Sequence, residues 1–95
     1  MKSIIQKDRE HCFVCGENGG YWGLDRHHVF FGANRNKSEK YGLYAFICHD
    51  RCHLNGVHKN HKIDLALKRY AQQKAMEYYG WSIEDFRKVF GKNYI

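Results

Sequence analysis

The spacing of apolar residues in the last third of the chain predicts two helices. Between residues 63 and 79 these residues recur mostly at three- and four-residue steps, the period of a helix with one buried face. The residues of that face are Ile63, Leu67, Tyr70, Ala71, Ala75 and Tyr78. Gly80 supplies a C-cap, and Ser82 with Asp85 three residues later forms a capping-box pattern that starts a second helix. The apolar face of this second helix, which Gly91 ends, consists of Ile83, Phe86, Val89 and Phe90.

The first two thirds of the chain have a different pattern, which predicts a hairpin. Residues 27–31 and 43–47 are short β-prone runs, and the second leads directly into Cys48. We expect residues 32–42 to be a basic loop and residues 49–60 to form a short helix, broken or frayed near Gly56. Residues 1–6 are interpreted as a mobile lead-in. The pattern therefore predicts an α+β fold, with a hairpin, a short helix and two C-terminal helices.

The length of the chain limits the number of domains. We expect a single domain over residues 1–95, with a core at about residues 11–61 and a helical extension over about residues 62–95. A domain this short often needs a metal or disulfides to stabilise it. The 43% hydrophobic and 16% aromatic content excludes a disordered chain.

The charge balance favours a polyanionic partner. Sixteen Lys and Arg against ten Asp and Glu give a net charge of +6, which suits nucleic acid. Polar residues follow Met1–Ile5 at once, and the longest apolar run, residues 43–48, is too short to cross a membrane. We therefore expect a cytoplasmic, intracellular protein with no membrane partner. Because thiols stay reduced in that compartment, the four cysteines indicate metal binding rather than disulfides.

The cysteines form two chelating pairs, Cys12-x2-Cys15 and Cys48-x3-Cys52. Two thiolates at such spacings can bind one tetrahedral Zn²⁺, and two pairs complete a closed structural site. Two alternatives stay open: four buried free cysteines, or an imidazole in place of one thiolate. Such an imidazole would come from one of the histidines beside the pairs, namely His11, His49 and His53.

The histidines predict a second metal site. His27 and His28 are neighbours on a predicted strand, so their side chains point to opposite faces and suit different tasks. His53 follows the last cysteine directly, and His58 lies five residues further along the predicted short helix. A hairpin and a helix joined by zinc would bring these side chains together. For His11, His49 and His61 we favour an ordinary surface or core role.

The order of these motifs resembles a known family. A Cys-x2-Cys pair, a His-His-Val sequence, and a strand leading into Cys-x3-Cys-His are similar to the HNH endonucleases, which have a zinc-bound ββα-metal core. The resemblance covers residues 12 to about 58. The segment 37–43, with 56–58 and 64–65, is also similar to small HNH proteins of phages and prophages. The family fold is thus a zinc-stapled ββα-metal core, here with two C-terminal helices.

The resemblance also implies roles for individual residues. It makes His27 a ligand of one catalytic divalent metal and His28 the general base that activates the attacking water. The resemblance makes His53 a second ligand and His58 a third. The five-residue offset of His58 from His53 does not suit a regular helix, and Gly56 could supply the helix distortion that this offset requires.

The chain departs from the family at two positions. The first ligand is often Asp, but here it is His27, with Asp25 two residues earlier. An imidazole-rich site suits Zn²⁺, Ni²⁺ or Mn²⁺ better than Mg²⁺. The family's middle Asn is missing before the second strand, and Asn34 or Asn36 could replace it in holding the loop of the base.

The implied activity is hydrolysis of DNA phosphodiester bonds to 5′-phosphate and 3′-hydroxyl ends. Imidazole titrates near pH ~6.5, so His28 can take a proton from water at neutral pH. Arg26, Arg35 or Lys37 would hold flanking phosphates, and a homodimer or a targeting partner would compensate for the small binding surface. Exposed Tyr21 and Trp22 could stack on unpaired bases.

Two other classes of function compete with the nuclease. A catalytically inactive, zinc-stabilised nucleic-acid-binding module would keep the cysteines and the basic surface without needing His28. A protein-interaction zinc domain would show no salt-dependent affinity for DNA.

Overall fold

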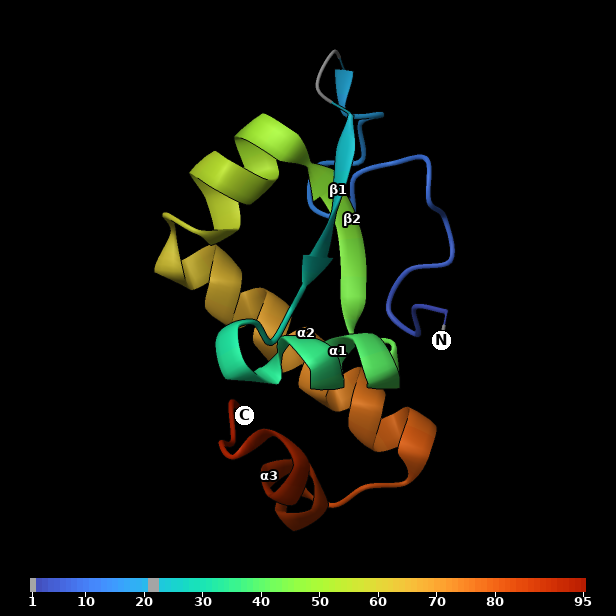
Figure 1. Cartoon of the computed structure of the whole chain (residues 1–95), viewed down its shortest axis with the longest axis vertical. Helices are drawn as coiled ribbons and strands as arrows, with labels where there is room; N and C mark the ends of the chain where they lie inside the picture. Colours follow the sequence, from blue (N-terminus) through green and yellow to red (C-terminus); the bar gives the residue numbers. More distant parts are fainter. Residues whose placement is uncertain (1, 21–22) are drawn as a thin grey trace.

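The protein is built around a two-stranded antiparallel hairpin with helices packed against it, so its architecture is α+β as predicted (Figure 1). The computed structural model describes residues 2–20 and 23–95. The elements in chain order are β1 (Leu24–His28), the 3-10 turn η2 (Gly32–Asn34), α1 (Arg35–Tyr41), β2 (Tyr44–Cys48), the π-helix η3 (His49–Val57), α2 (His61–Tyr79) and α3 (Ile83–Phe90). Tyr21 and Trp22, with their predicted stacking role, lie outside the described residues.

The register of the hairpin divides its side chains between two faces. His28 pairs with Tyr44 and Arg26 with Phe46, whereas His27 pairs with Ala45. Because side chains alternate along a strand, Arg26, His28, Tyr44 and Phe46 share the outer face. The opposite face carries His27 and Ala45, both buried, toward the helices. The predicted separation of the two neighbouring histidines onto opposite faces is thus confirmed.

Strand β1 begins and ends earlier than predicted. Val29 and Phe30 were expected in the strand because they are β-prone, but they leave it and are buried in the core. Their backbone groups have other partners: Val29 N–H donates to Leu43 O at 3.1 Å. The Ser38 hydroxyl accepts from Phe30 N at 3.0 Å and donates to Phe30 O at 2.6 Å. The apolar residues are therefore used for packing rather than for pairing.

The basic loop predicted over residues 32–42 is instead a 3-10 turn followed by helix α1. The prediction was wrong because this segment lacks an apolar stripe, and its buried side chain is the small hydroxyl of Ser38. Tertiary contacts stabilise the helix, including one from Lys37 Nζ to Val89 O at 2.7 Å. Gly42, with φ of 73°, ends it in the left-handed conformation.

The short helix predicted after Cys48 is a π-helix, η3. His58 N–H donates to His53 O at 3.3 Å, a five-residue step that corresponds to π rather than α geometry. The buried Gly56 packs closely here, because a Cβ on this residue would lie 3.0 Å from Arg51 O. The expected distortion near Gly56 is therefore present, and π geometry suits the five-residue spacing of the two histidines.

Helices α2 and α3 match their predicted bounds closely. Ser82 and Asp85 form the expected capping box, and Gly80 and Gly91 end the helices with positive φ. The predicted faces are only partly buried, because Tyr78 is 62% exposed and Ile83 is 40% exposed. One apolar core links the hairpin, the N-terminal segment and both helices. Among the described helices, none is long and apolar enough to cross a lipid bilayer.

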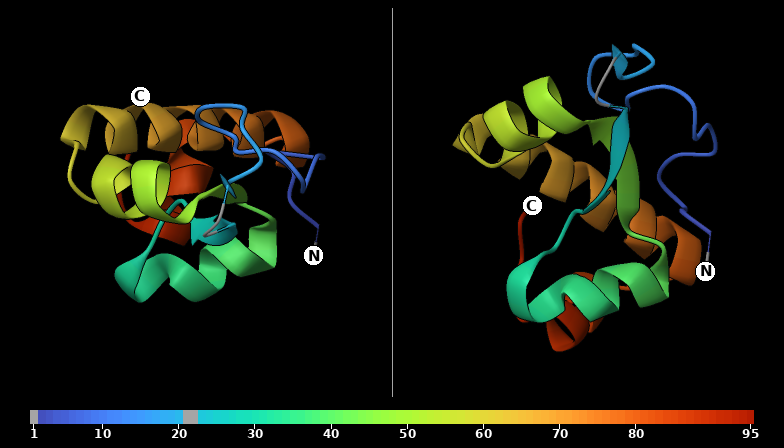
Figure 2. Two further views of the ribbon diagram at one scale, coloured as in Figure 1. Left: turned by 90° about the horizontal axis from the view of Figure 1, so that it is seen from above. Right: turned by 45° about the horizontal axis from the view of Figure 1, so that its top comes forward.

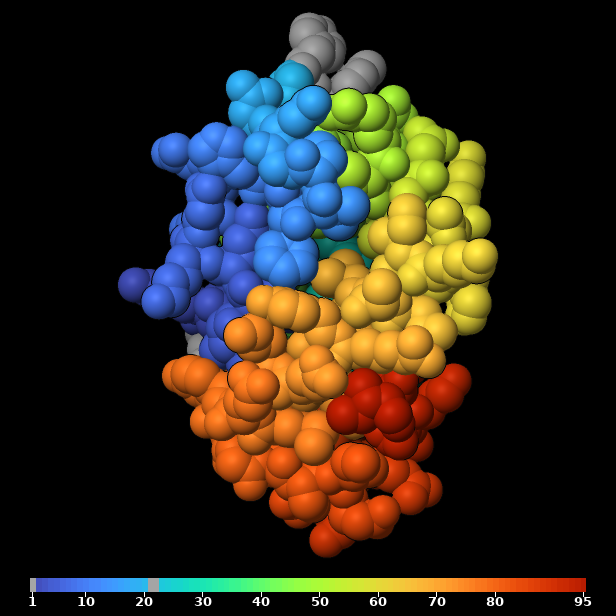
Figure 3. Space-filling model, turned by 180° about the vertical axis from the view of Figure 1, so that it is seen from behind, coloured from blue at the N-terminus to red at the C-terminus, as the bar shows by residue number. Residues whose placement is uncertain are grey.

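The N-terminal segment runs alongside β2 and is not a free lead-in, which corrects the prediction for residues 2–6. Ser3 Oγ donates to Tyr44 O at 2.5 Å, and Phe46 N–H donates to Gln6 Oε1 at 2.7 Å. Ile5 is buried in the core. Figure 2 shows the segment beside the hairpin, and Figure 3 shows it with α2 on the back of the molecule. The side chains of Ser3 and Gln6 thus bind backbone groups at the edge of β2 that a third strand would otherwise bind.

Candidate metal centres

The four cysteines converge on one point, as their spacing predicted. The sulfur atoms of Cys12, Cys15, Cys48 and Cys52 all lie within 4.8 Å of one another, and those of Cys15 and Cys48 are 3.5 Å apart. Four sulfurs at ~2.3 Å from a tetrahedral ion would be separated by about 3.8 Å. The cluster is therefore compatible with a structural Zn²⁺ bound by four thiolates, without an imidazole replacing any of them.

Polar groups around the cluster favour the thiolate form of Cys12. Burial raises the pKa of Cys12, but backbone N–H groups of Cys15, Cys48 and Val14 outweigh it and lower this pKa to about 6. Arg51 Nη2 lies 4.0 Å from the sulfurs of Cys15 and Cys48. Burial raises the pKa of Cys48 and Cys52. Removing two protons from buried thiols requires a compensating cation, which zinc would supply.

Three histidines form a second cluster. Candidate ligand nitrogens of His27, His53 and His58 lie within 4.8 Å of one another, and the Nε2 atoms of His53 and His58 are 3.0 Å apart. His27 is 2% exposed, and among the described residues its Nε2 is buried without a hydrogen-bond partner. Burial lowers the pKa of His27 to about 3, so its imidazole is neutral at physiological pH. Neutral imidazole nitrogens that face one another fit a divalent cation.

The carboxylate of Asp25 orients one histidine of the cluster, His53. Its Oδ2 accepts hydrogen bonds from His53 Nδ1 at 2.8 Å and from His49 Nδ1 at 2.6 Å. Burial raises the pKa of Asp25, but these two hydrogen bonds outweigh it and lower the pKa. With its proton held on Nδ1, His53 presents the lone pair of Nε2 to the cluster. Metal-binding histidines commonly have this arrangement, in which a carboxylate fixes the tautomer.

We expect Asp25→Asn to weaken metal binding at the histidine cluster by about 10–100-fold, because the tautomer and ring orientation of His53 are no longer fixed. Titration of zinc-loaded protein with Ni²⁺ or Mn²⁺, followed calorimetrically, measures the change. Asp8→Asn is the matched control, since Asp8 accepts from His11 at 2.6 Å on the surface. Equal affinities in the two variants would contradict the positioning role of Asp25.

His28 lies beside the cluster and is held by α1. Its Nε2–H donates to Glu39 Oε1 at 2.9 Å, and the side chain is only 10% exposed. The hydrogen bond from His28, reinforced by Arg26, lowers the pKa of Glu39, so the acceptor is a carboxylate. The other ring nitrogen, Nδ1, accepts from Arg35 Nε in a long contact of 3.4 Å. The imidazole therefore has one fixed and one displaceable partner.

A small hollow of about 170 Å³ joins these groups. It is lined by Arg26, His27, His28, Phe31, Arg35, His53 and His58. The structure thus brings six of the predicted catalytic, metal-binding and phosphate-binding residues together. Lys37 is not among the lining residues, because it caps the end of α3 through its contact with Val89 O.

Asn34 and Asn36, the two predicted substitutes for the missing asparagine, both lie in the segment between β1 and β2. Asn34 Nδ2 donates to Phe90 O at 3.1 Å and so connects η2 to α3. Ser38 holds the chain that follows His28, through both of its hydrogen bonds to Phe30. Asn36 lies in the same helix as Ser38, on the segment predicted as a loop.

Sequence reasoning noted Asp25 near His27 without giving it a role, and it missed Glu39. A signal for Asp25 was its alternation with His27, which puts both side chains on one face of the strand. Glu39 carried no comparable signal, because it reaches His28 only through the packing of α1 against β1. Comparison of the chain with protein families, curated proteins and solved structures finds no match.

Proposed function

We propose that this protein is a metal-dependent endonuclease of the HNH type that hydrolyses phosphodiester bonds in DNA. His28 is the general base, and a single catalytic divalent cation is held by His27, His53 and His58. One observation carries the proposal: a ring nitrogen of buried His27 lies within 4.8 Å of ring nitrogens of His53 and His58, and His28 lines the same hollow. Among the described residues, Nε2 of His27 has no hydrogen-bond partner. The net charge of +6 supports a polyanionic substrate.

A cation on these nitrogens would supply a Lewis acid for a phosphate oxygen and for the leaving oxygen. The chain's own residues handle the proton. Glu39 accepts from Nε2–H of His28, which leaves Nδ1 as the nitrogen that takes a proton from water. The carboxylate also stabilises the imidazolium that results. As water attacks phosphorus, the bond to the 3′-oxygen breaks and a 5′-phosphate is formed. The leaving 3′-oxygen takes a proton from solvent and becomes the 3′-hydroxyl.

The two arginines at the hollow position the substrate. Arg35 contacts Nδ1 of His28 only at 3.4 Å, so a phosphate can draw its guanidinium away and leave that nitrogen to water. Arg26 Nη1 is 2.9 Å from Glu39 Oε1, so Arg26 lies beside the base and its carboxylate. Cations at this place also stabilise the charge that develops on the phosphate.

Nicking of supercoiled plasmid by purified, zinc-loaded protein tests the proposal. Mg²⁺, Mn²⁺, Ni²⁺ and Zn²⁺ are added separately, and we expect nicking only with added cation, with Mg²⁺ the weakest. His58→Ala should abolish the response, whereas His61→Ala removes another exposed histidine outside the hollow and should retain it.

Two results would count against the nuclease. If the protein binds DNA but does not cut it with any of the four cations, the inactive zinc-stabilised binding module becomes the better account. If it shows no salt-dependent affinity for DNA either, a zinc domain that contacts proteins is favoured.

A further inference from the structure

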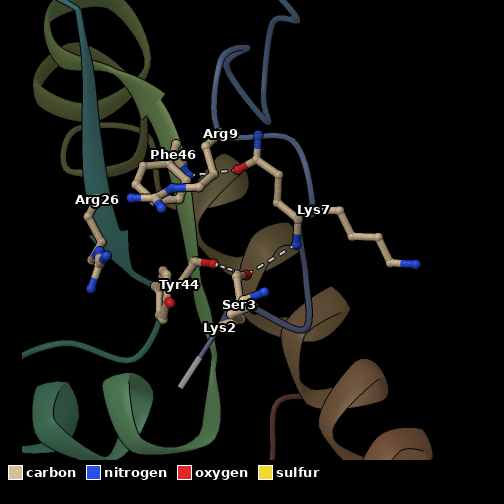
Figure 4. A pocket seen from close by; sticks show the side chains of 8 residues that line it. Lys2, Ser3, Lys7, Arg9, Arg26, Tyr44 and Phe46 are labelled. Atoms are coloured by element: carbon tan, nitrogen blue, oxygen red, sulfur yellow. Dashed lines mark hydrogen bonds between the residues drawn. The ribbon is translucent and has the colours of Figure 1, made fainter.

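A second hollow lies on the outer face of the hairpin, between β1, β2 and the N-terminal segment (Figure 4). This basic groove has a volume of about 530 Å³. Its lining residues are Lys2, Ser3, Gln6, Lys7, Arg9, Arg26, Tyr44 and Phe46. Four of them are cationic and none is acidic. The groove therefore has the composition of an anion-binding surface.

The arginines of the groove are held in place by aromatic rings. The Arg9 guanidinium lies 5.2 Å from the centre of Phe46, and that of Arg26 lies 4.5 Å from the centre of Tyr44. Such stacking fixes the plane of a guanidinium while its N–H groups remain able to bind oxygen. Figure 4 shows Arg9 and Arg26 beside these rings, and Lys7 extending away from them.

The same stacking argues against nucleobases as the groove's ligand. Tyr44 is only 4% exposed and lies beneath Arg26, so it has no free face for a base. The groups that the groove offers are cationic N–H donors. Phosphate oxygens satisfy such donors, whereas stacked bases need an uncovered ring.

The basic groove and the histidine hollow share Arg26 as a lining residue. The strand register places Arg26 and His28 on the face that also carries Tyr44 and Phe46. A chain of phosphates that passes over His28 and along this face therefore meets Arg26 first and then Arg9. Glu39 pairs with Arg26 on the side of the hollow.

We propose that the basic groove binds the DNA phosphate backbone on one side of the bond that is cleaved. This inference rests on the proposed nuclease function and adds to it a backbone track, with Arg9 as its outer contact. Because the contact is electrostatic, it acts on DNA of any sequence.

The salt dependence of DNA affinity tests this inference. Binding of a fluorescent duplex is followed by anisotropy at several salt concentrations, in zinc-loaded His28→Ala protein that leaves the DNA uncut. We expect Arg9→Gln to reduce the slope of log affinity against log salt by about 0.9, the value for one phosphate contact. Arg9→Lys, which keeps the charge, should restore most of the slope.

The matched control is Arg87→Gln, which removes an exposed arginine that pairs with Glu84 on α3, outside the groove. The inference would be overturned if Arg9→Gln left the slope of log affinity against log salt unchanged. It would also be overturned if Arg87→Gln lowered this slope by the same amount. Plasmid nicking by the same variants with His28 intact separates the two proposals. If the protein cleaves the plasmid but Arg9→Gln leaves the salt slope unchanged, only the proposed role of the groove is rejected. If Arg9→Gln reduces the salt slope but the protein does not cleave, only the nuclease proposal is rejected.

Discussion

Replacing His28 by alanine is expected to slow DNA cleavage by about 10²–10⁴-fold, the usual contribution of a general base. The geometry gives the reason: Nε2–H of His28 is held by Glu39, so Nδ1 is the nitrogen that can accept a proton from water. His28 lies outside the histidine cluster that would bind the cation. Metal binding and DNA affinity should therefore persist, and the loss should fall on kcat rather than on KM.

Single-turnover cleavage of a labelled duplex with saturating cation measures this loss, and zinc content and circular dichroism verify that the variant is folded. His11→Ala is the matched control, because His11 also bonds to a carboxylate, that of Asp8, but on the surface. Cleavage by His28→Ala within a few-fold of the unmodified protein would assign the base to another group. Loss of zinc from the variant would instead reveal a structural role.

The parts of the fold that the sequence predicted well depend on local signals. The capping box of Ser82 and Asp85 and the glycine after each helix act within a few residues, so α2 and α3 were predicted nearly to the residue. The metal clusters were predictable because spacing restricts which side chains can share an ion. Cys48 ends β2, Cys52 lies four residues later in η3, and His53 follows Cys52 directly.

The features that the sequence did not predict depend on tertiary contacts. Helix α1 has no apolar face, and its glutamate reaches His28 only after the chain has folded back. β1 was misplaced because Val29 and Phe30 look like strand residues but pack in the core. The sequence predicted a helix distorted near Gly56, but it did not predict that η3 would have π geometry.

The four-cysteine cluster leads to the prediction with the largest expected effect on stability. Removing zinc with a chelator under reducing conditions should unfold the protein. Structural zinc binds with apparent free energies on the order of 10 kcal/mol, comparable to the whole stability of a small domain, about 5–15 kcal/mol. Buried Cys12, Cys48 and Cys52 belong to the core. The loss of zinc therefore affects the packing of the core as well as the link between the Cys12–Cys15 segment and β2. Circular dichroism and urea titration before and after chelation measure the effect.

Loss of the zinc should also abolish the histidine cluster, because η3 carries Cys52 and His53 at adjacent positions. Cys52→Ser is therefore expected to lose both zinc and affinity for a second cation. His58→Ala is the opposite control, since it removes an exposed ligand of the second cluster and should retain the zinc and the fold. A chelated protein that still unfolds cooperatively at nearly the same urea concentration would mean that the four cysteines are free thiols in an apolar core. In that case the packing of η3 alone would hold His53 and His58 together. The protein would then still bind the second cation when this cation is added back after chelation.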